Sequence, residues 1–127
     1  YNPDARDKAS SNVYRTKEIL KRHWDGQVVK TPFHRVIQAD RRHALNYLIQ
    51  STSSDVFLDR AYAIHSALKG RRSFVSMLIH DSVVLDIAEE DMKILKNIVD
   101  IFSDTRYGKY KVGVNAGKSF GDMRRIR

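Results

Sequence analysis

The segment from Phe74 to Ile87 constrains the fold of this chain more than any other. It places two β-rich apolar runs on either side of a His80-Asp81-Ser82 triplet and leaves no room for a long loop. This pattern predicts a tight β-hairpin with a carboxylate at its tip. Flanking strands would hold the backbone of Asp81 in place, and a hard cation such as Mg²⁺ prefers rigidly placed carboxylate oxygens.

A purely structural interpretation of the same triplet is also open. Asp and Ser are common turn formers, so an ordinary hairpin explains these residues without any function. The choice between a metal site and an ordinary turn therefore depends on the rest of the chain.

Length and composition predict one globular domain covering residues 1–127. A chain of 127 residues can bury roughly two thirds of its unfolded surface. Its residues are 42% hydrophobic and 30% charged, and no apolar run approaches the ~20 residues that span a bilayer. The absence of Cys excludes disulfides, thiolate metal sites and a Cys nucleophile. We expect an intracellular protein that does not contact membranes.

The charge balance points to a polyanionic partner. The 23 Lys and Arg residues outnumber the 15 Asp and Glu residues, which gives a net charge of +8. A membrane surface would also attract such a chain, but no segment combines a strong amphipathic pattern with an exposed Trp and Lys face. Nucleic acid is therefore the favoured partner.

The first 38 residues predict a helix followed by a short strand and a turn. Asn2-Pro3-Asp4 is typical of a helix start, and the helix should run to about Trp24. A strand is expected over residues 27–31, before a turn at Pro32. The apolar face of the helix consists of Ala9, Val13, Leu20 and Trp24. In the loop that follows, Thr31, His34 and Arg35 could touch phosphates, or could simply be polar loop residues.

Residues 40–69 predict two helices. The run Ser51–Asp55 interrupts the apolar pattern, and Thr52 with Asp55 has the spacing of a capping box that starts a new helix. Gly70 is the expected C-cap.

In the first of these helices, Arg42, Asn46 and Gln50 recur every four residues and should share one face. Such side chains can donate hydrogen bonds to purine N3 and pyrimidine O2 in the minor groove of every correct base pair. Three exposed polar residues on a surface helix are the alternative interpretation.

The remainder predicts a helix and a closing strand, which makes the fold class α+β. Residues 88–91 supply an acidic helix start that the helix dipole explains. Tyr110–Asn115 alternates as a strand that could pair with the hairpin in an antiparallel sheet of at least three strands packed against several helices. The expected core face of the helix is Met92, Leu95, Val99 and Phe102.

Two segments together resemble the C-terminal part of the family A DNA polymerases, the DNA polymerase I family. The first is Arg42–Asp55 and the second, about 25 residues later, is Leu78–Leu85. The turn Thr31–Arg35 and the tail from Lys111 to Phe120 extend the resemblance over nearly the whole chain.

The resemblance implies DNA synthesis by nucleotidyl transfer from a dNTP to a primer 3′-hydroxyl. Residues 1–38 would form a leading helix and turn, 39–70 the duplex-tracking helices, and 71–127 the hairpin, helix and closing strand of a palm subdomain next to fingers and thumb-side helices. Asp81 would bind the catalytic Mg²⁺ ions, with His80 near the primer terminus. The implied DNA contacts are Thr31, Arg35, Arg42, Asn46 and Gln50.

The chain departs from the family pattern in two ways. Ser82 stands where the family has Glu, and the family's second metal-binding Asp and nucleotide-binding fingers helix have no counterpart here. We therefore expect a phage-like or split polymerase in which an N-terminal portion completes the two-metal site, acting in the host cytoplasm if phage-encoded. The alternative is a non-catalytic module that binds duplex DNA. A basic ribonucleoprotein component would leave the two ordered motifs unexplained.

Overall fold

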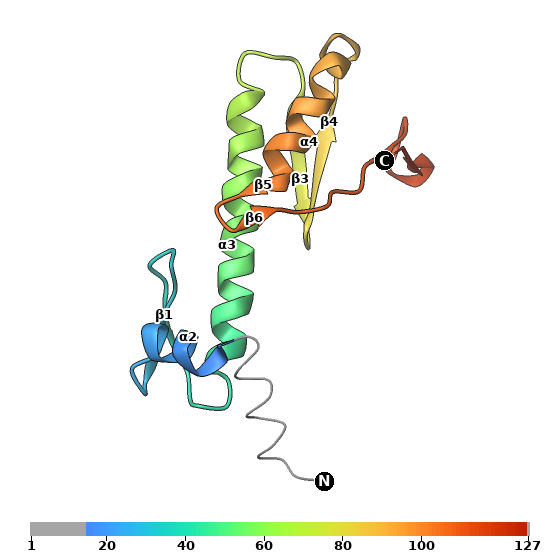
Figure 1. The fold of residues 1–127 in the computed structure, drawn as a ribbon. Coiled ribbons are helices and arrows are strands. Elements are labelled where there is room, and N and C mark those ends of the chain that lie inside the picture. Colours follow the sequence, from blue (N-terminus) through green and yellow to red (C-terminus); the bar gives the residue numbers. More distant parts are fainter. Residues whose placement is uncertain (1–14, 127) are drawn as a thin grey trace. The chain divides into compact units, whose positions relative to one another are not determined.

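The computed structural model describes residues 15–126, which belong to two compact units (Figure 1). The first unit ends at Asp55 and the second begins at Val56. Helices combine with two-stranded antiparallel sheets, so the predicted α+β class is confirmed. The elements in chain order are α2 Thr16–His23, β1 Val28–Lys30, β2 Val36–Gln38, α3 Ala44–Ala67, β3 Phe74–Ile79, β4 Ser82–Asp86, a 3-10 helix Glu89–Ile94, α4 Leu95–Ser103, β5 Asp104–Thr105, β6 Gly108–Lys109, β7 Asn115–Ala116, a 3-10 helix Phe120–Asp122, and β8 Arg124–Arg125.

The N-terminal unit packs α2 and the β1–β2 hairpin around a small apolar core. The predicted strand is present as β1, and the chain returns as β2, a strand that the sequence pattern did not reveal. The buried core residues are Val29, Ala39, Ala44 and Leu48, with Leu20, Trp24 and Tyr47 packed against them. Leu20 and Trp24 thus face the core as predicted, whereas the predicted helix start and the residues Ala9 and Val13 lie outside the described part of the chain.

Helix α3 is continuous, so the predicted break at Ser51–Asp55 is wrong. Asp55 caps no helix there, because its carboxylate pairs with Arg35 instead. The hydroxyl of Thr52 is buried and has no hydrogen-bond partner among the described residues. Ser and Thr favour helices only weakly, but each half of α3 contributes residues to an apolar core, and this packing outweighs local propensity.

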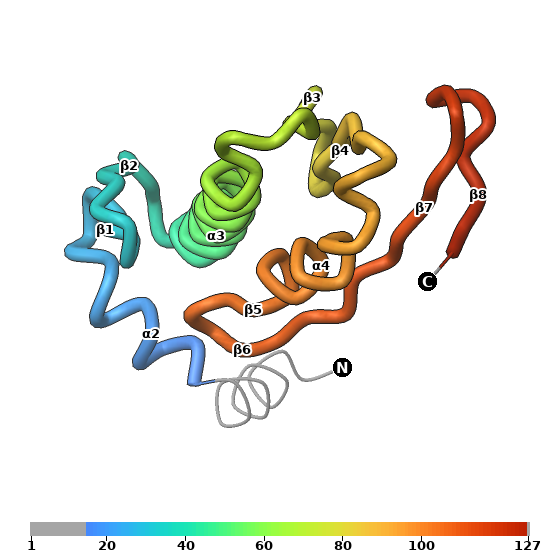
Figure 2. Tube along the Cα trace, turned by 90° about the horizontal axis from the view of Figure 1, so that it is seen from above, coloured from blue at the N-terminus to red at the C-terminus, as the bar shows by residue number. Residues whose placement is uncertain are grey.

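The C-terminal unit is built on the β3–β4 hairpin, which confirms the central prediction. The strands pair antiparallel from Phe74 with Asp86 to Ile79 with Ser82, with one irregularity between Val75 and Met77. The hairpin and α4 lie beside the C-terminal turns of α3 (Figure 2). Ile64, Leu68 and Ile98 form the buried centre, and the partly buried residues around them are Val75, Val83, Leu85, Ile87, Ile94, Ile101 and Phe102.

The helix after the hairpin presents a different face to the core from the one predicted. Ile98 is buried, whereas Met92 is 51% exposed. Met92 belongs to a 3-10 helix of residues 89–94, which has about three residues per turn and precedes α4. The core face of α4 is centred on Ile98, with Ile94 and Ile101 packed beside it, and this second apolar stripe has α-helical spacing as well. Of the predicted face, Phe102 packs against the core.

The predicted sheet of three or more strands is absent from the described residues. Residues 110–114 form no strand, and the chain beyond them folds back on itself as β7 and β8. Every sheet in the described part of the chain is therefore a separate two-stranded pair. Closing a short local loop costs less chain entropy than bringing a distant segment to the hairpin, which explains why the C-terminal segment pairs locally.

Candidate catalytic hairpin and nucleic-acid interface

The tip of the β3–β4 hairpin is a two-residue turn made of His80 and Asp81. β3 ends at Ile79 and β4 begins at Ser82, so these strand ends pair directly. His80 has a φ angle of 53°, in the left-handed region that costs a non-Gly residue roughly 1–2 kcal/mol. His is among the residues that enter this region more readily than most. The paired strands impose the conformation, and this fixes the backbone that carries Asp81.

Asp81 presents an unengaged carboxylate. Its side chain is exposed, and within residues 15–126 it takes part in no hydrogen bond or ion pair. An ionised carboxylate has about four lone-pair sites for hydrogen bonds or metal coordination. These are the hard oxygen ligands that Mg²⁺ takes, so Asp81 is chemically suited to bind a divalent cation.

A second carboxylate does not accompany Asp81 at the tip. Asp86 pairs with Phe74 at the opposite end of the hairpin, about 16 Å away at the rise of an extended strand. Ser82 is exposed next to Asp81 but offers only a hydroxyl. No group of three or more His, Cys, Asp or Glu residues within the described range could hold a metal ion. The tip thus supplies one anionic ligand.

The predicted polar stripe is exposed. Asn46 and Gln50 lie on the surface of α3, one turn apart. Arg42 is also exposed, but it belongs to the turn before the helix rather than to the helix itself. The side chain of Asp40 holds this turn, because its Oδ1 accepts hydrogen bonds from the backbone N–H groups of Arg42 and His43, each at 3.0 Å.

Asp40 and His43 form a hydrogen-bonded pair of side chains at the start of α3. Nδ1 of His43 lies 2.8 Å from Oδ1 of Asp40. The His43 side chain, together with the backbone donors, lowers the pKa of the Asp40 carboxyl below 3.8. An ionised Asp at a helix start also satisfies free backbone donors and the helix dipole. The hydrogen bonds to Asp40 therefore hold the backbone of Arg42 in place before α3.

The turn after β1 gives Thr31 and Arg35 different roles. Thr31 is 4% exposed, and its Oγ1 accepts a hydrogen bond from the backbone N–H of Arg35 at 3.1 Å. The two backbones are also joined by a hydrogen bond from the N–H of Thr31 to the carbonyl of Arg35 at 2.9 Å. Thr31 therefore shapes the turn from inside. His34, which the loop also contains, is exposed at a φ angle of 65°.

The Arg35 side chain is exposed, although its Nε is hydrogen-bonded. Its Nε donates to both carboxylate oxygens of Asp55, at 2.9 and 2.7 Å. The Arg35 side chain is 55% exposed, against 9% for that of Asp55. The hydrogen bond and charge of Asp55 raise the pKa of Arg35. The terminal guanidinium nitrogens make no hydrogen bond in the described chain and can meet a phosphate, which Arg binds well.

An ion pair that the sequence pattern did not reveal anchors the base of the hairpin. Asp91 is 4% exposed and accepts hydrogen bonds from the Ser73 hydroxyl at 2.6 Å and from Arg71 at 3.1 Å. The Ser73 hydroxyl also accepts the N–H of Ala88 at 2.8 Å. Ser73 precedes β3 and Ala88 follows β4, so their approach follows from the hairpin register. The identity of the acidic partner could not be read from the sequence.

The predicted site residues thus fall into two groups. Thr31, Arg35, Arg42, Asn46 and Gln50 belong to the N-terminal unit. His80 and Asp81 belong to the C-terminal unit. No helix in residues 15–126 has the length and apolar character needed to cross a membrane. Comparisons of the chain with protein-family models, with curated proteins and with solved structures find no match.

Proposed function

We propose that this chain supplies the catalytic hairpin and the duplex-contacting helix of a template-directed DNA polymerase. The reaction is nucleotidyl transfer from a dNTP to a primer 3′-hydroxyl. The observation that carries the proposal is the exposed, unengaged carboxylate of Asp81 at a conformationally fixed hairpin tip. The resemblance of Arg42–Asp55 and Leu78–Leu85 to family A DNA polymerases supports it. Such an enzyme would act inside the cell, in the host cytoplasm if phage-encoded.

Asp81 would hold Mg²⁺ through its carboxylate oxygens. Mg²⁺ takes about six oxygen ligands and usually keeps water and substrate phosphates among them, so one carboxylate is a suitable but incomplete ligand set. A second carboxylate would come from an N-terminal polymerase portion, on the same or another polypeptide. A bound pair of such ions stabilises the attacking and leaving oxygens of an in-line displacement. His80, next in the turn, would lie near the primer terminus.

The N-terminal unit would bind the primer-template duplex. The exposed amides of Asn46 and Gln50 can donate to the minor-groove acceptors that all correct base pairs share, and Arg42 can donate beside them. Arg35 can donate hydrogen bonds to a backbone phosphate from its terminal nitrogens while Nε stays paired with Asp55. Thr31 would take part only indirectly, by shaping the turn that presents Arg35.

The test is Mg²⁺-dependent primer extension by the native preparation, together with whatever polypeptide co-purifies with the chain. Asp81→Ala should abolish extension and leave duplex affinity largely intact. Asp86→Ala is the matched control, because it removes an exposed carboxylate from the other end of the same hairpin. Extension that survives Asp81→Ala, or that is lost equally in Asp86→Ala, would exclude Asp81 as the metal ligand.

The second candidate is a non-catalytic duplex-binding module. It is favoured by the single carboxylate at the hairpin tip. Under this alternative the native preparation binds primer-template but never extends it. Gln50→Ala weakens duplex binding under both proposals, so metal-dependent extension is the measurement that separates them.

A further inference from the structure

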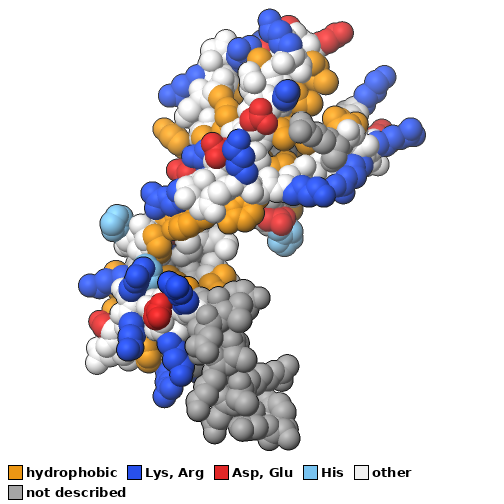
Figure 3. Space-filling model, viewed as in Figure 1, with side chains coloured by type: hydrophobic (Ala, Val, Ile, Leu, Met, Phe, Trp, Pro, Cys, Tyr) orange, Lys and Arg blue, Asp and Glu red, His pale blue; other side chains and the backbone are white. Residues whose placement is uncertain are grey.

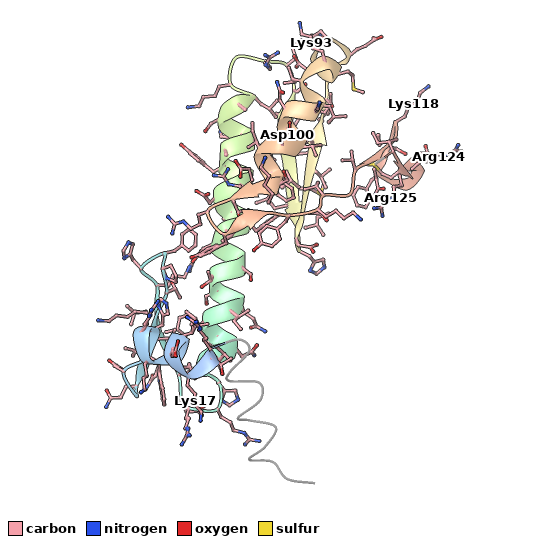
Figure 4. The ribbon with its side chains drawn as sticks, in the orientation of Figure 1. Lys17, Lys93, Asp100, Lys118, Arg124 and Arg125 are labelled. Atoms are coloured by element: carbon pink, nitrogen blue, oxygen red, sulfur yellow. The ribbon has the colours of Figure 1, made fainter. Side chains whose placement is uncertain are left out.

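The C-terminal arm, residues 106–126, concentrates much of the positive charge of the chain. It holds six of the 23 Lys and Arg residues and one acid, a net +5 of the total +8. Figure 3 shows Lys and Arg side chains gathered over this segment. Figure 4 shows Lys118, Arg124 and Arg125 around β7 and β8. Within residues 15–126, no ion pair engages Lys109, Lys111, Lys118, Arg124 or Arg125.

Three aromatic rings of the same segment are exposed. The exposed fractions are 49% for Tyr107, 58% for Tyr110 and 65% for Phe120. Tyr107 lies in the two-residue turn between β5 and β6, and Phe120 begins the 3-10 turn between β7 and β8. None of the three stacks on another ring in the described part of the chain. All three rings are therefore accessible to a ligand.

We propose that the C-terminal arm binds single-stranded DNA. The occupant follows from charge complementarity together with the aromatic rings. A basic surface alone attracts any polyanion, but exposed aromatic rings gain stacking energy only from bases that are not already paired. Because every base has a stacking face, such binding depends little on sequence. The cations would follow the phosphates, and Tyr107, Tyr110 and Phe120 would stack on bases.

This inference goes beyond the proposed polymerase function and does not depend on Asp81 or on a metal. The binding surface uses residues of the C-terminal unit alone. It can therefore be tested on the full chain in the presence of a chelator. Asp81→Ala should abolish primer extension without changing the binding of single-stranded DNA by the arm. Arm variants that lose this binding would leave the metal-binding role proposed for Asp81 untouched.

The contribution of stacking is tested by fluorescence anisotropy of a labelled oligothymidine. Tyr110→Ala and Phe120→Ala should each weaken binding by about fivefold or more, the effect of one lost base stack. Tyr62→Ala is the control, because Tyr62 is an equally exposed ring, at 67%, on α3. An unchanged affinity in both arm variants, or an equal loss in Tyr62→Ala, would overturn the proposal. Circular dichroism of each variant confirms that it is folded.

The contribution of charge is tested by comparing two triple variants. Lys118→Ala/Arg124→Ala/Arg125→Ala should reduce affinity and lower the slope of log affinity against log salt by about 2, for three phosphate contacts on a single strand. The matched control, Lys17→Ala/Lys21→Ala/Arg22→Ala, removes three exposed cations from α2 and should change little. Equal losses in the two triple variants would mean a diffuse electrostatic effect and would refute a defined site on the arm.

Discussion

Nε of Arg35 donates hydrogen bonds to both carboxylate oxygens of Asp55, across 20 positions of sequence. This pair joins the turn after β1 to the middle of α3 inside the N-terminal unit. Asp55 has the capping-box spacing from Thr52, yet its carboxylate is used by Arg35 and the residue lies inside the continuous helix α3. The buried carboxylate is satisfied by a partner that local sequence does not reveal.

Arg35→Ala should destabilise the protein. Asp55, 8% exposed, would keep its carboxylate in place with no charged donor, and an unpaired buried charge is costly. We expect a lower midpoint of urea unfolding with an unchanged slope. Arg41→Ala, which removes an exposed cation from the nearby turn, is the control. Adding Asp55→Asn to Arg35→Ala should recover part of the loss, and equal effects of Arg35→Ala and Arg41→Ala would contradict the structure.

Ile64→Ala should cost about 2–5 kcal/mol of unfolding free energy, the range for truncating a buried Ile. Ile64 is 2% exposed at the centre of the C-terminal core beside Leu68 and Ile98. Tyr62→Ala, two positions away and 67% exposed, should change stability by no more than about 0.5 kcal/mol. Urea titrations followed by circular dichroism measure both. Similar losses in the two variants would mean that the core lies elsewhere.

The stability of the protein should fall in acid because of Asp91. The Ser73 hydroxyl, and then Arg71, hold the pKa of this carboxyl below 3.8 in the folded state. The stabilisation is therefore complete above the unfolded pKa and is lost as the pH falls through the lower folded pKa. Unfolding free energies measured downward from about pH 5 should show this decline. Ser73→Ala should make the decline shallower, whereas Ser66→Ala, at an exposed position, should leave the decline unchanged.

Gly117→Ala should open the β7–β8 pair. A Cβ atom at position 117 would lie 2.5 Å from the backbone carbonyl oxygen of Asp122, which is too close for any real contact. Gly121→Ala is the matched control, because a Cβ there meets nothing within 4 Å. The readout is hydrogen exchange at the amide of Ile126, which donates to the carbonyl of Val114 at 2.8 Å. Faster exchange in Gly121→Ala as well would show that the close approach is not what matters.

Ser82→Glu tests the proposed metal site from the opposite direction to Asp81→Ala. Ser82 is exposed beside Asp81, so a Glu there would add a second carboxylate at the hairpin tip. Because anionic oxygens bind Mg²⁺ more strongly than a hydroxyl does, half-maximal extension should require less Mg²⁺. Ser76→Glu, on β3 away from the tip, is the control. A requirement that stays the same in Ser82→Glu would argue against metal binding at this turn.

Local patterns predicted the elements whose partners are close in sequence. The hairpin was predictable because two apolar runs meet at a two-residue turn, and Gly70 takes the positive φ of 77° expected after a helix end. Exposure of Asn46 and Gln50 followed from helical spacing. The phase of α4 was not predictable, because the sequence offers two apolar stripes at α-helical spacing and only packing in the folded unit selects the one centred on Ile98.

The sequence by itself determined the α+β composition, the hairpin with Asp81 at its tip, and the excess of positive charge. Only the tertiary structure decided that Ser51–Asp55 stays helical and that residues 110–115 do not join the hairpin. It also decided the partners of the two buried carboxylates, Asp55 and Asp91. The physical reason is range: turns and periodicity act within a few residues, whereas burial and ion pairing depend on segments that meet only once the chain has folded.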